Sequence, residues 1–97
     1  TGDFVEAEEA YRIGLIDVLV DEGDHLERAI ELAGRMARWS PVALRLGKDA
    51  IRAAFEKPLS EGLTYEMERF LDAFASEDGK EGVAAFVEKR KPEFTGR

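Results

Sequence analysis

Apolar side chains recur at helical spacing through most of the 97 residues, and this periodicity constrains the fold more than any other feature. The clearest stripe occupies positions i, i+4, i+7, i+8 and i+11, and consists of Leu63, Met67, Phe70, Leu71 and Phe74. Similar stripes predict a mainly α fold of about five helices, over residues 6–13, 25–38, 41–56, 61–75 and 77–91. The loops between them are short, so we expect consecutive helices to pack as neighbours.

Capping residues indicate where these helices begin and end. Ser40 and Pro41 predict an N-cap followed by proline at the first helical position, where its missing N–H costs nothing. Ser60 and Ser76 are predicted to cap the next two helices. Gly14 follows the first helix, at a position where a left-handed residue commonly ends a helix.

Residues 15–20, L-I-D-V-L-V, are short and rich in branched side chains, which makes them the only strand candidate. An extended apolar segment that packs on helices without a partner strand accounts for the pattern equally well. The sequence leaves both alternatives open.

The apolar face of helix 41–56 is too wide for a helix that is covered on one side only. Gly34 lies inside helix 25–38, where glycine costs about 1 kcal/mol relative to alanine, so a close helix contact is expected there. Trp39 ends that helix and is predicted to be a packing anchor. Because a small bundle cannot hide all of these faces, we expect the chain to self-associate.

Composition excludes several functional classes. The net charge of −7 argues against nucleic-acid binding, and the absence of cysteine excludes disulfides and thiolate metal sites. No run is long enough to span a membrane, and no signal peptide is visible, so we expect a cytoplasmic protein. The sequence opens without Met, which suggests a fragment, although a processed or engineered start would look the same.

The C-terminal stretch carries the strongest candidate site. Four basic groups lie in the last nine residues of this acidic chain, and Pro92 is expected to end the last helix. Phe86 and Lys89 are three residues apart, so their side chains should lie side by side, with Arg90 on the apolar face of the same helix. Such a pair could stack on an adenine and meet a phosphate. Spacing alone favours a core Phe86 and a solvated Lys89.

Other charged residues suggest no chemistry. The carboxylates at 6–9 and 21–24, and Glu66 with its neighbour Glu68, have the pattern of solvated surface charge. His25 has no second histidine for a metal site and no nucleophile partner. Lys48 could pair with Glu66 if their helices are antiparallel. No catalytic residue and no metal site are therefore predicted.

Three motifs resemble the crotonase family, the enoyl-CoA hydratases and isomerases. The most extensive is E-G-x-x-A-F-x-E-K-R-x-P-x-F, at residues 81–94. A T-G-x(4)-A-x-x-A-x-x-x-G-L run starts at Thr1, and S-P-x-A-x-x-x-x-K joins Ser40 to Lys48. The resemblance covers the whole chain, in the order and spacing of the family's C-terminal end.

The resemblance implies that residues 1–97 form a single C-terminal helical region of a longer enzyme that acts on acyl-CoA thioesters. Hydration of 2-enoyl-CoA in fatty acid metabolism is the expected reaction. The oxyanion hole and the catalytic glutamates would lie upstream, so this chain alone should be inactive. Phe86 and Lys89 match the residues that lie near the adenine and phosphates of coenzyme A, often the one held by a neighbouring subunit. Coenzyme A enters as part of the substrate, and no other cofactor is implied.

The resemblance also implies a homo-oligomer, a trimer or hexamer, assembled largely through this region. Net charge and the lack of a long apolar run leave neither nucleic acid nor membrane as an expected partner. A non-catalytic helical oligomerisation or interaction module would explain the wide apolar faces equally well. A helical module that binds another anionic ligand is a third alternative, which a binding screen of coenzyme A against other nucleotides would distinguish.

Overall fold

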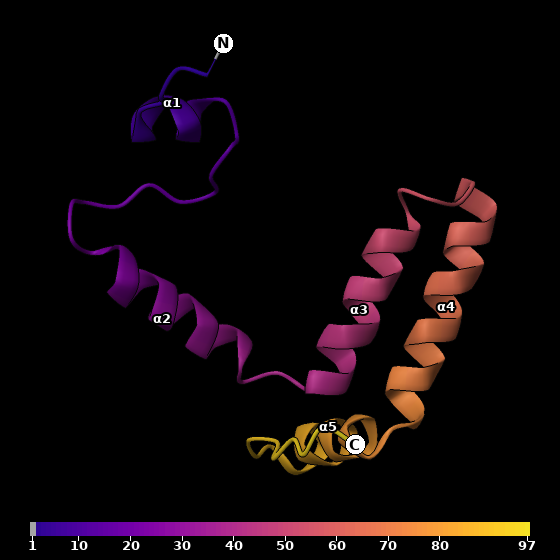
Figure 1. Ribbon diagram of the computed structural model, residues 1–97. Helices are drawn as coiled ribbons and strands as arrows, with labels where there is room; N and C mark the ends of the chain where they lie inside the picture. The colour runs from indigo at the N-terminus through magenta and orange to yellow at the C-terminus, as the bar shows by residue number, and fades with distance from the viewer. Residues whose placement is uncertain (1) are drawn as a thin grey trace. The chain divides into compact units, whose positions relative to one another are not determined.

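The computed structural model describes residues 2–97 and contains five α-helices, with no strand among these residues (Figure 1). The helices are α1 (Ala7–Arg12), α2 (His25–Met36), α3 (Pro41–Ala53), α4 (Leu59–Ala75) and α5 (Glu77–Glu88). The prediction of a mainly α fold with about five helices is confirmed. Residues 15–20 have no partner strand, as in the second of the two alternatives, but Leu15 and Val18 are 67% and 56% exposed, so the packing on helices expected for this segment is absent from the described residues. Thr1, which the resemblance also uses, lies outside the described residues.

The chain divides into two compact units, Thr1–Gly34 and Arg35–Arg97. In the first, α1 ends at Arg12, and Gly14 has the predicted left-handed conformation, with a φ of 75°. The Leu15 amide donates to the Ala10 carbonyl at 2.8 Å, and the Gly14 amide donates to the Tyr11 carbonyl at 3.1 Å. These two bonds form a Schellman motif, which satisfies carbonyl groups left free at the end of a helix.

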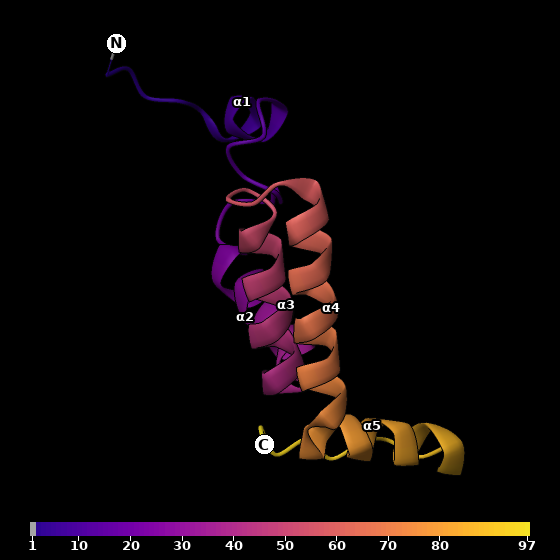
Figure 2. The ribbon, with the colours of Figure 1, turned by 90° about the vertical axis from the view of Figure 1, so that its right-hand side faces the viewer.

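In the second unit, α3 and α4 lie side by side as an antiparallel hairpin, and α5 crosses the end of that hairpin where α4 finishes (Figures 1 and 2). The chain then reverses and returns beside α5 to the start of α3. A Cβ atom built on Gly96 would lie 3.7 Å from the Pro41 ring. The expectation that consecutive helices pack as neighbours is confirmed for α3 with α4 and for α4 with α5.

The ends of α3 and α4 test the predicted caps. The Ser40 hydroxyl accepts from the Ala43 amide at 3.1 Å, so this N-cap is confirmed. The Ser60 cap is wrong, because α4 already begins at Leu59, after an extended Pro58. The α3 helix ends at Ala53 rather than at 56, since the amides of Phe55 and Glu56 donate to carbonyls three residues earlier instead of four.

Few side chains are buried within the described chain. The buried apolar residues are all small: Ala10, Val42, Ala53 and Ala85. Trp39, predicted as a packing anchor, is 64% exposed, and nothing approaches within 4 Å of a Cβ atom built on Gly34. The predicted contacts of both residues are therefore absent from residues 2–97.

An apolar groove of ≈ 680 Å³ runs between α3 and α4. Ala43, Gly47, Leu63 and Phe70 line it, together with Glu66, which forms no ion pair with Lys48 anywhere in the described structure. The larger apolar side chains of both helices are exposed. Exposed apolar surface of this extent is typical of a region that packs against other protein.

Candidate functional site

The start of α5 is fixed by its N-cap and by one glycine. The Ser76 hydroxyl accepts from the Gly79 amide at 2.9 Å, which confirms the predicted cap. A Cβ atom built on Gly79 would lie 2.6 Å from the Phe74 carbonyl oxygen, closer than any real side chain allows. The tight turn from α4 into α5 therefore requires glycine at this position.

Asp78 joins three segments of the second unit, a role that the sequence did not predict. Its carboxylate is 2% exposed and accepts from the Ser40 hydroxyl at 2.7 Å. It also accepts from the Thr95 amide at 2.7 Å, from the Gly96 amide at 3.1 Å and from the Thr95 hydroxyl at 3.4 Å. In return, the Asp78 amide donates to the Arg97 carbonyl at 2.8 Å. The starts of α3 and α5 and the end of the chain therefore meet at one carboxylate.

The surroundings of Asp78 favour its charged form. Burial alone would raise the pKa of this carboxyl, but the hydrogen bonds from Ser40, Thr95 and Gly96 outweigh that effect and lower the pKa below its usual value. A buried carboxylate is tolerated when donors satisfy its oxygens, and here both oxygens accept hydrogen bonds. Asp78 is therefore a structural anchor for the C-terminal segment rather than an acid or base.

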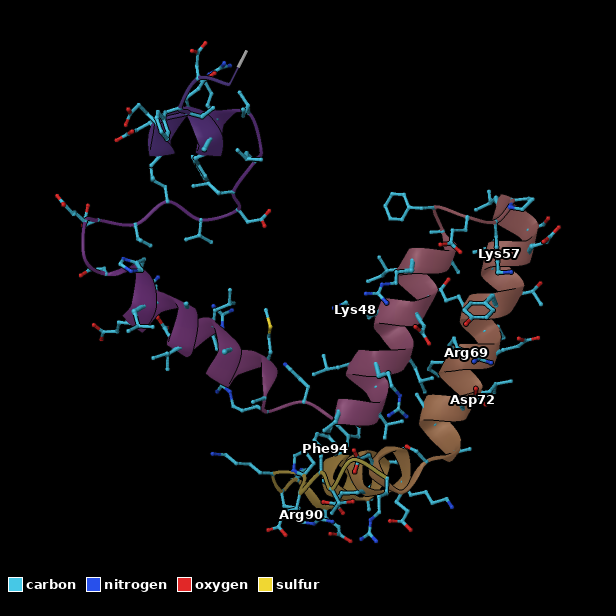
Figure 3. All side chains as sticks on the ribbon, in the orientation of Figure 1. Lys48, Lys57, Arg69, Asp72, Arg90 and Phe94 are labelled. Carbon is cyan, nitrogen blue, oxygen red and sulfur yellow. The ribbon has the colours of Figure 1, made fainter. Side chains whose placement is uncertain are left out.

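A second carboxylate, Glu81, fastens the middle of the returning segment. Both of its oxygens accept from the Arg90 guanidinium, one of them at 2.8 Å, and Oε1 also accepts from the Glu93 amide at 2.8 Å. The hydrogen bonds from Arg90, followed by the one from Glu93, lower the pKa of Glu81 to about 2. A Cβ atom built on Gly82 would lie 3.6 Å from the Phe94 ring, so the ring rests against this glycine. Figure 3 shows Arg90 and Phe94 on the returning segment, beside α5.

The prediction that α5 runs to 91, with Arg90 on its apolar face, is wrong. The helix ends at Glu88, because Lys89 is left-handed, with φ 56° and ψ 37°. The Arg90 amide donates to the Ala85 carbonyl at 3.0 Å and the Lys89 amide donates to the Phe86 carbonyl at 3.3 Å. This is the motif that also ends α1. Arg90 therefore leaves the helix surface and reaches back to Glu81.

Phe86 and Lys89, the two predicted site residues, lie together at this end of α5. The Phe86 side chain is 84% exposed although the neighbouring Ala85 is buried. Lys89 is exposed and forms no ion pair within 4.0 Å with any residue that the structure describes. Both side chains are thus available to a ligand, and the expectation that Phe86 is a core residue fails for the described chain. Their role in binding coenzyme A stays a prediction.

Elsewhere on the described surface, charged side chains pair with one another or with an aromatic ring. Within residues 2–97, no three His, Asp or Glu side chains gather as metal ligands would, and no helix is long and apolar enough to cross a membrane. The Tyr65 ring has the Arg69 guanidinium 4.8 Å and the Lys57 ammonium 5.4 Å from its centre. Arg69 in turn pairs with Asp72 at 3.1 Å, and Figure 3 shows these charged residues along the α3–α4 hairpin. These contacts hold side chains of the hairpin together.

A family model described as enoyl-CoA hydratase/isomerase matches residues 1–97. A probable enoyl-CoA hydratase of Mycobacterium bovis is 47% identical over all 97 residues, which span 38% of that relative. The 2,3-dehydroadipyl-CoA hydratase of Escherichia coli is 40% identical over the same length and share. The crystal structure of an enoyl-CoA hydratase from Mycobacterium tuberculosis H37Rv matches all of this chain and 38% of its own, with a TM-score of 0.89 at 35% identity. The chain thus spans under two-fifths of the length of these relatives.

Proposed function

Because this chain belongs to the enoyl-CoA hydratase/isomerase family, in which it matches the C-terminal region, we propose that it completes an enzyme that hydrates 2-enoyl-CoA. The similarity to relatives named as hydratases, at 47% and 40% identity, supports hydration over the other reactions of the family. Fatty acid metabolism is the proposed setting. With 36% charged residues the chain suits an aqueous compartment, for which we propose the cytoplasm.

The chemical step is assigned to the part of the enzyme that precedes this chain. Asp78 and Glu81, the carboxylates with the most hydrogen bonds in the second unit, have pKa values below their usual range, and their oxygens already accept hydrogen bonds from this chain. Such carboxylates suit neither a general acid nor a general base near neutral pH. The 97-residue chain should therefore not hydrate crotonyl-CoA. Loss of the conjugated thioester absorbance measures the reaction, and turnover above a heat-treated sample would contradict this division of labour.

The proposed contribution of this chain to substrate binding is a contact with coenzyme A by Phe86 and Lys89. One observation carries it: the charged motif residues Glu81, Glu88 and Arg90 pair with one another, whereas the side chains of Phe86 and Lys89 are exposed and unpaired within the described structure. An exposed ring can stack on adenine, and an exposed ammonium can meet phosphate. Lys89 lies one turn beyond Phe86, so one ligand end could touch both.

The test compares two substrates of the full-length enzyme. Lys89→Ala should cost about 1 kcal/mol of acyl-CoA binding and Phe86→Ala about 1–3 kcal/mol, so both should raise KM more than they lower kcat. A short acyl-pantetheine lacks the adenosine and its phosphates, so its kinetics should not change. Lys80→Ala, which removes an exposed cation from the start of α5, is the matched control for charge. Equal losses on both substrates would make the two residues structural.

Assembly is the second proposed contribution. The groove between α3 and α4 and the exposed side chains of Leu63, Met67 and Phe74 provide the apolar surface that a contact with neighbouring protein buries. We propose that this face helps to build a homotrimer or a pair of trimers. Sedimentation of the isolated chain at high micromolar concentration should show self-association, and a clean monomer would count against it. A non-catalytic interaction module would self-associate as well, so the substrate comparison separates the two functions.

A further inference from the structure

Two helices of this chain end in the same backbone geometry with different residues at the left-handed position. At the end of α1 that residue is Gly14, and at the end of α5 it is Lys89. The pairs of capping hydrogen bonds are equivalent, from Leu15 and Gly14 in one case and from Arg90 and Lys89 in the other. Lys89 is the only residue other than glycine with a positive φ among residues 2–97. A lysine at this position therefore needs support that the end of α1 does not need.

The support visible in the structure comes from the residues on both sides of Lys89. The Arg90 guanidinium binds both oxygens of Glu81, and its Nε donates to the Glu88 carboxylate at 2.6 Å. The guanidinium of Arg90, the residue after Lys89, thus binds both Glu88, the residue before Lys89, and Glu81. Glu81 lies in the first half of α5, so it anchors the turn to the body of the helix. It also accepts from the Glu93 amide, which fixes the chain beyond the turn.

We propose that Glu81 is a positioning residue, which acts through Arg90 to hold Lys89 left-handed with its ammonium placed for the phosphates of acyl-CoA. This inference rests on the proposed function of Lys89. In this role Glu81 need not touch the substrate, because it affects substrate binding only through Arg90 and the backbone conformation of Lys89. Left-handed backbone is unfavourable for a side chain with a Cβ atom, and persists where surrounding contacts enforce it.

Electrostatics and positioning predict opposite signs for the loss of Glu81. A carboxylate near phosphate repels it, so removing the charge alone should strengthen acyl-CoA binding. If Glu81 positions Lys89, removing the charge should instead weaken binding, because Arg90 loses its two-point partner and the turn relaxes. The direction of the change in KM therefore distinguishes the two effects.

The experiment uses the full-length enzyme with acyl-CoA and acyl-pantetheine. Glu81→Gln should raise KM for acyl-CoA about threefold, with little change in kcat or in either constant for acyl-pantetheine. Arg90→Lys should do the same, because an ammonium cannot bind both carboxylate oxygens as the guanidinium does. The matched control is Glu93→Gln, which removes a carboxylate from the segment beyond the turn and keeps the amide that donates to Glu81. Its KM for acyl-CoA should stay unchanged or fall.

A double-mutant cycle decides whether Glu81 acts through Lys89. In a Lys89→Ala background, Glu81→Gln should add less than a 1.5-fold change in KM, on the order of the error expected for independent effects. An unchanged or lower KM for Glu81→Gln in the otherwise native enzyme overturns the proposal, and so does an undiminished rise in the Lys89→Ala background. In both cases the contact between Lys89 and coenzyme A stands if Lys89→Ala itself raises KM. If Lys89→Ala has no effect on KM, the proposed contact and the positioning role fall together.

Folding defects are detected in the same set of variants. A loss of structure in Glu81→Gln would lower kcat on both substrates, whereas loss of positioning affects only the substrate that carries phosphates. If Glu81→Gln yields no folded enzyme, Arg90→Lys, which retains both charges of the pair, takes its place in the cycle. Equal damage on both substrates by Arg90→Lys would overturn the proposal.

Discussion

Replacing Lys89 by glycine separates the backbone role of this position from its charge. A left-handed residue with a Cβ atom costs about 1–2 kcal/mol, whereas the extra freedom of glycine in the unfolded chain costs about 0.5–1 kcal/mol. With a φ of 56° at residue 89, Lys89→Gly should therefore raise the free energy of unfolding by about 0.5–1 kcal/mol. The same substitution removes the cation and should raise KM for acyl-CoA about fivefold, equivalent to about 1 kcal/mol. The expected variant is more stable and binds substrate less well.

Urea denaturation followed by circular dichroism measures the first effect, and steady-state kinetics of the full-length enzyme measures the second. Lys89→Ala loses the same charge but keeps the left-handed cost, so its KM should match that of Lys89→Gly without the gain in stability. Gly14→Ala provides the reverse control: it places a Cβ atom at a φ of 75° in the same motif, so it should lower the free energy of unfolding by about 1 kcal/mol or more. The reasoning is refuted if Lys89→Gly is no more stable than Lys89→Ala. It is also refuted if the two differ in KM for acyl-CoA.

Three further substitutions, two of them with a control substitution elsewhere in the chain, test the framework around the site. Folding lowers the pKa of Glu81 from 4.5 to about 2, so the stabilisation by its charged form is complete above about pH 4.5 and is lost as the pH falls toward 2. Urea titrations should therefore show that the free energy of unfolding of Glu81→Gln depends less on pH over this window than that of the native enzyme. Gly79→Ala should cost well over 1 kcal/mol because its Cβ would meet backbone oxygen, whereas Gly34→Ala, with open space around it, should increase helix content by circular dichroism. Ser40→Ala should lower the free energy of unfolding by about 1–2 kcal/mol through loss of its cap, while Ser60→Ala, whose side chain caps nothing, should stay within about 0.5 kcal/mol.

Local rules predicted the order of the helices and several of their ends. Ser40, Ser76 and Gly14 act within one turn of their own position, so their roles follow from neighbouring sequence alone. The Ser60 cap failed because the helix starts two residues earlier, with Pro58 at the N-cap; the Pro58 carbonyl accepts from the Gly62 amide at 2.9 Å, and no side chain caps this start. A serine near a proline offers two competing starts, and the sequence contains no signal that chooses between them.

The contacts that define the site are not local, and periodicity could not find them. Asp78 reaches Ser40, which is 38 residues away, and Thr95, which is 17 residues away. The neighbouring sequence shows only that Asp78 follows the predicted cap Ser76 by two residues, where a carboxylate favours the helix dipole, which is a weaker role than the one observed. Its burial depends on the return of the chain to the start of α3, and that return requires the helix to end before Pro92.

Arg90 is the residue at which sequence and structure diverge most, and the reason is a competition between two contacts. At helical spacing from Val83 it extends the apolar face of α5, and Pro92 permits helix as far as residue 91. The helix instead ends at Glu88, because a left-handed Lys89 lets the Arg90 guanidinium bind both oxygens of Glu81. Four residues of the family motif (Glu81, Gly82, Arg90 and Phe94) thereby form the contacts that hold the returning C-terminal segment against α5. Of the motif residues that this closure leaves exposed, Phe86 supplies an aromatic ring and Lys89 an ammonium without an ion-pair partner in the described structure, which is why these two carry the proposed contact.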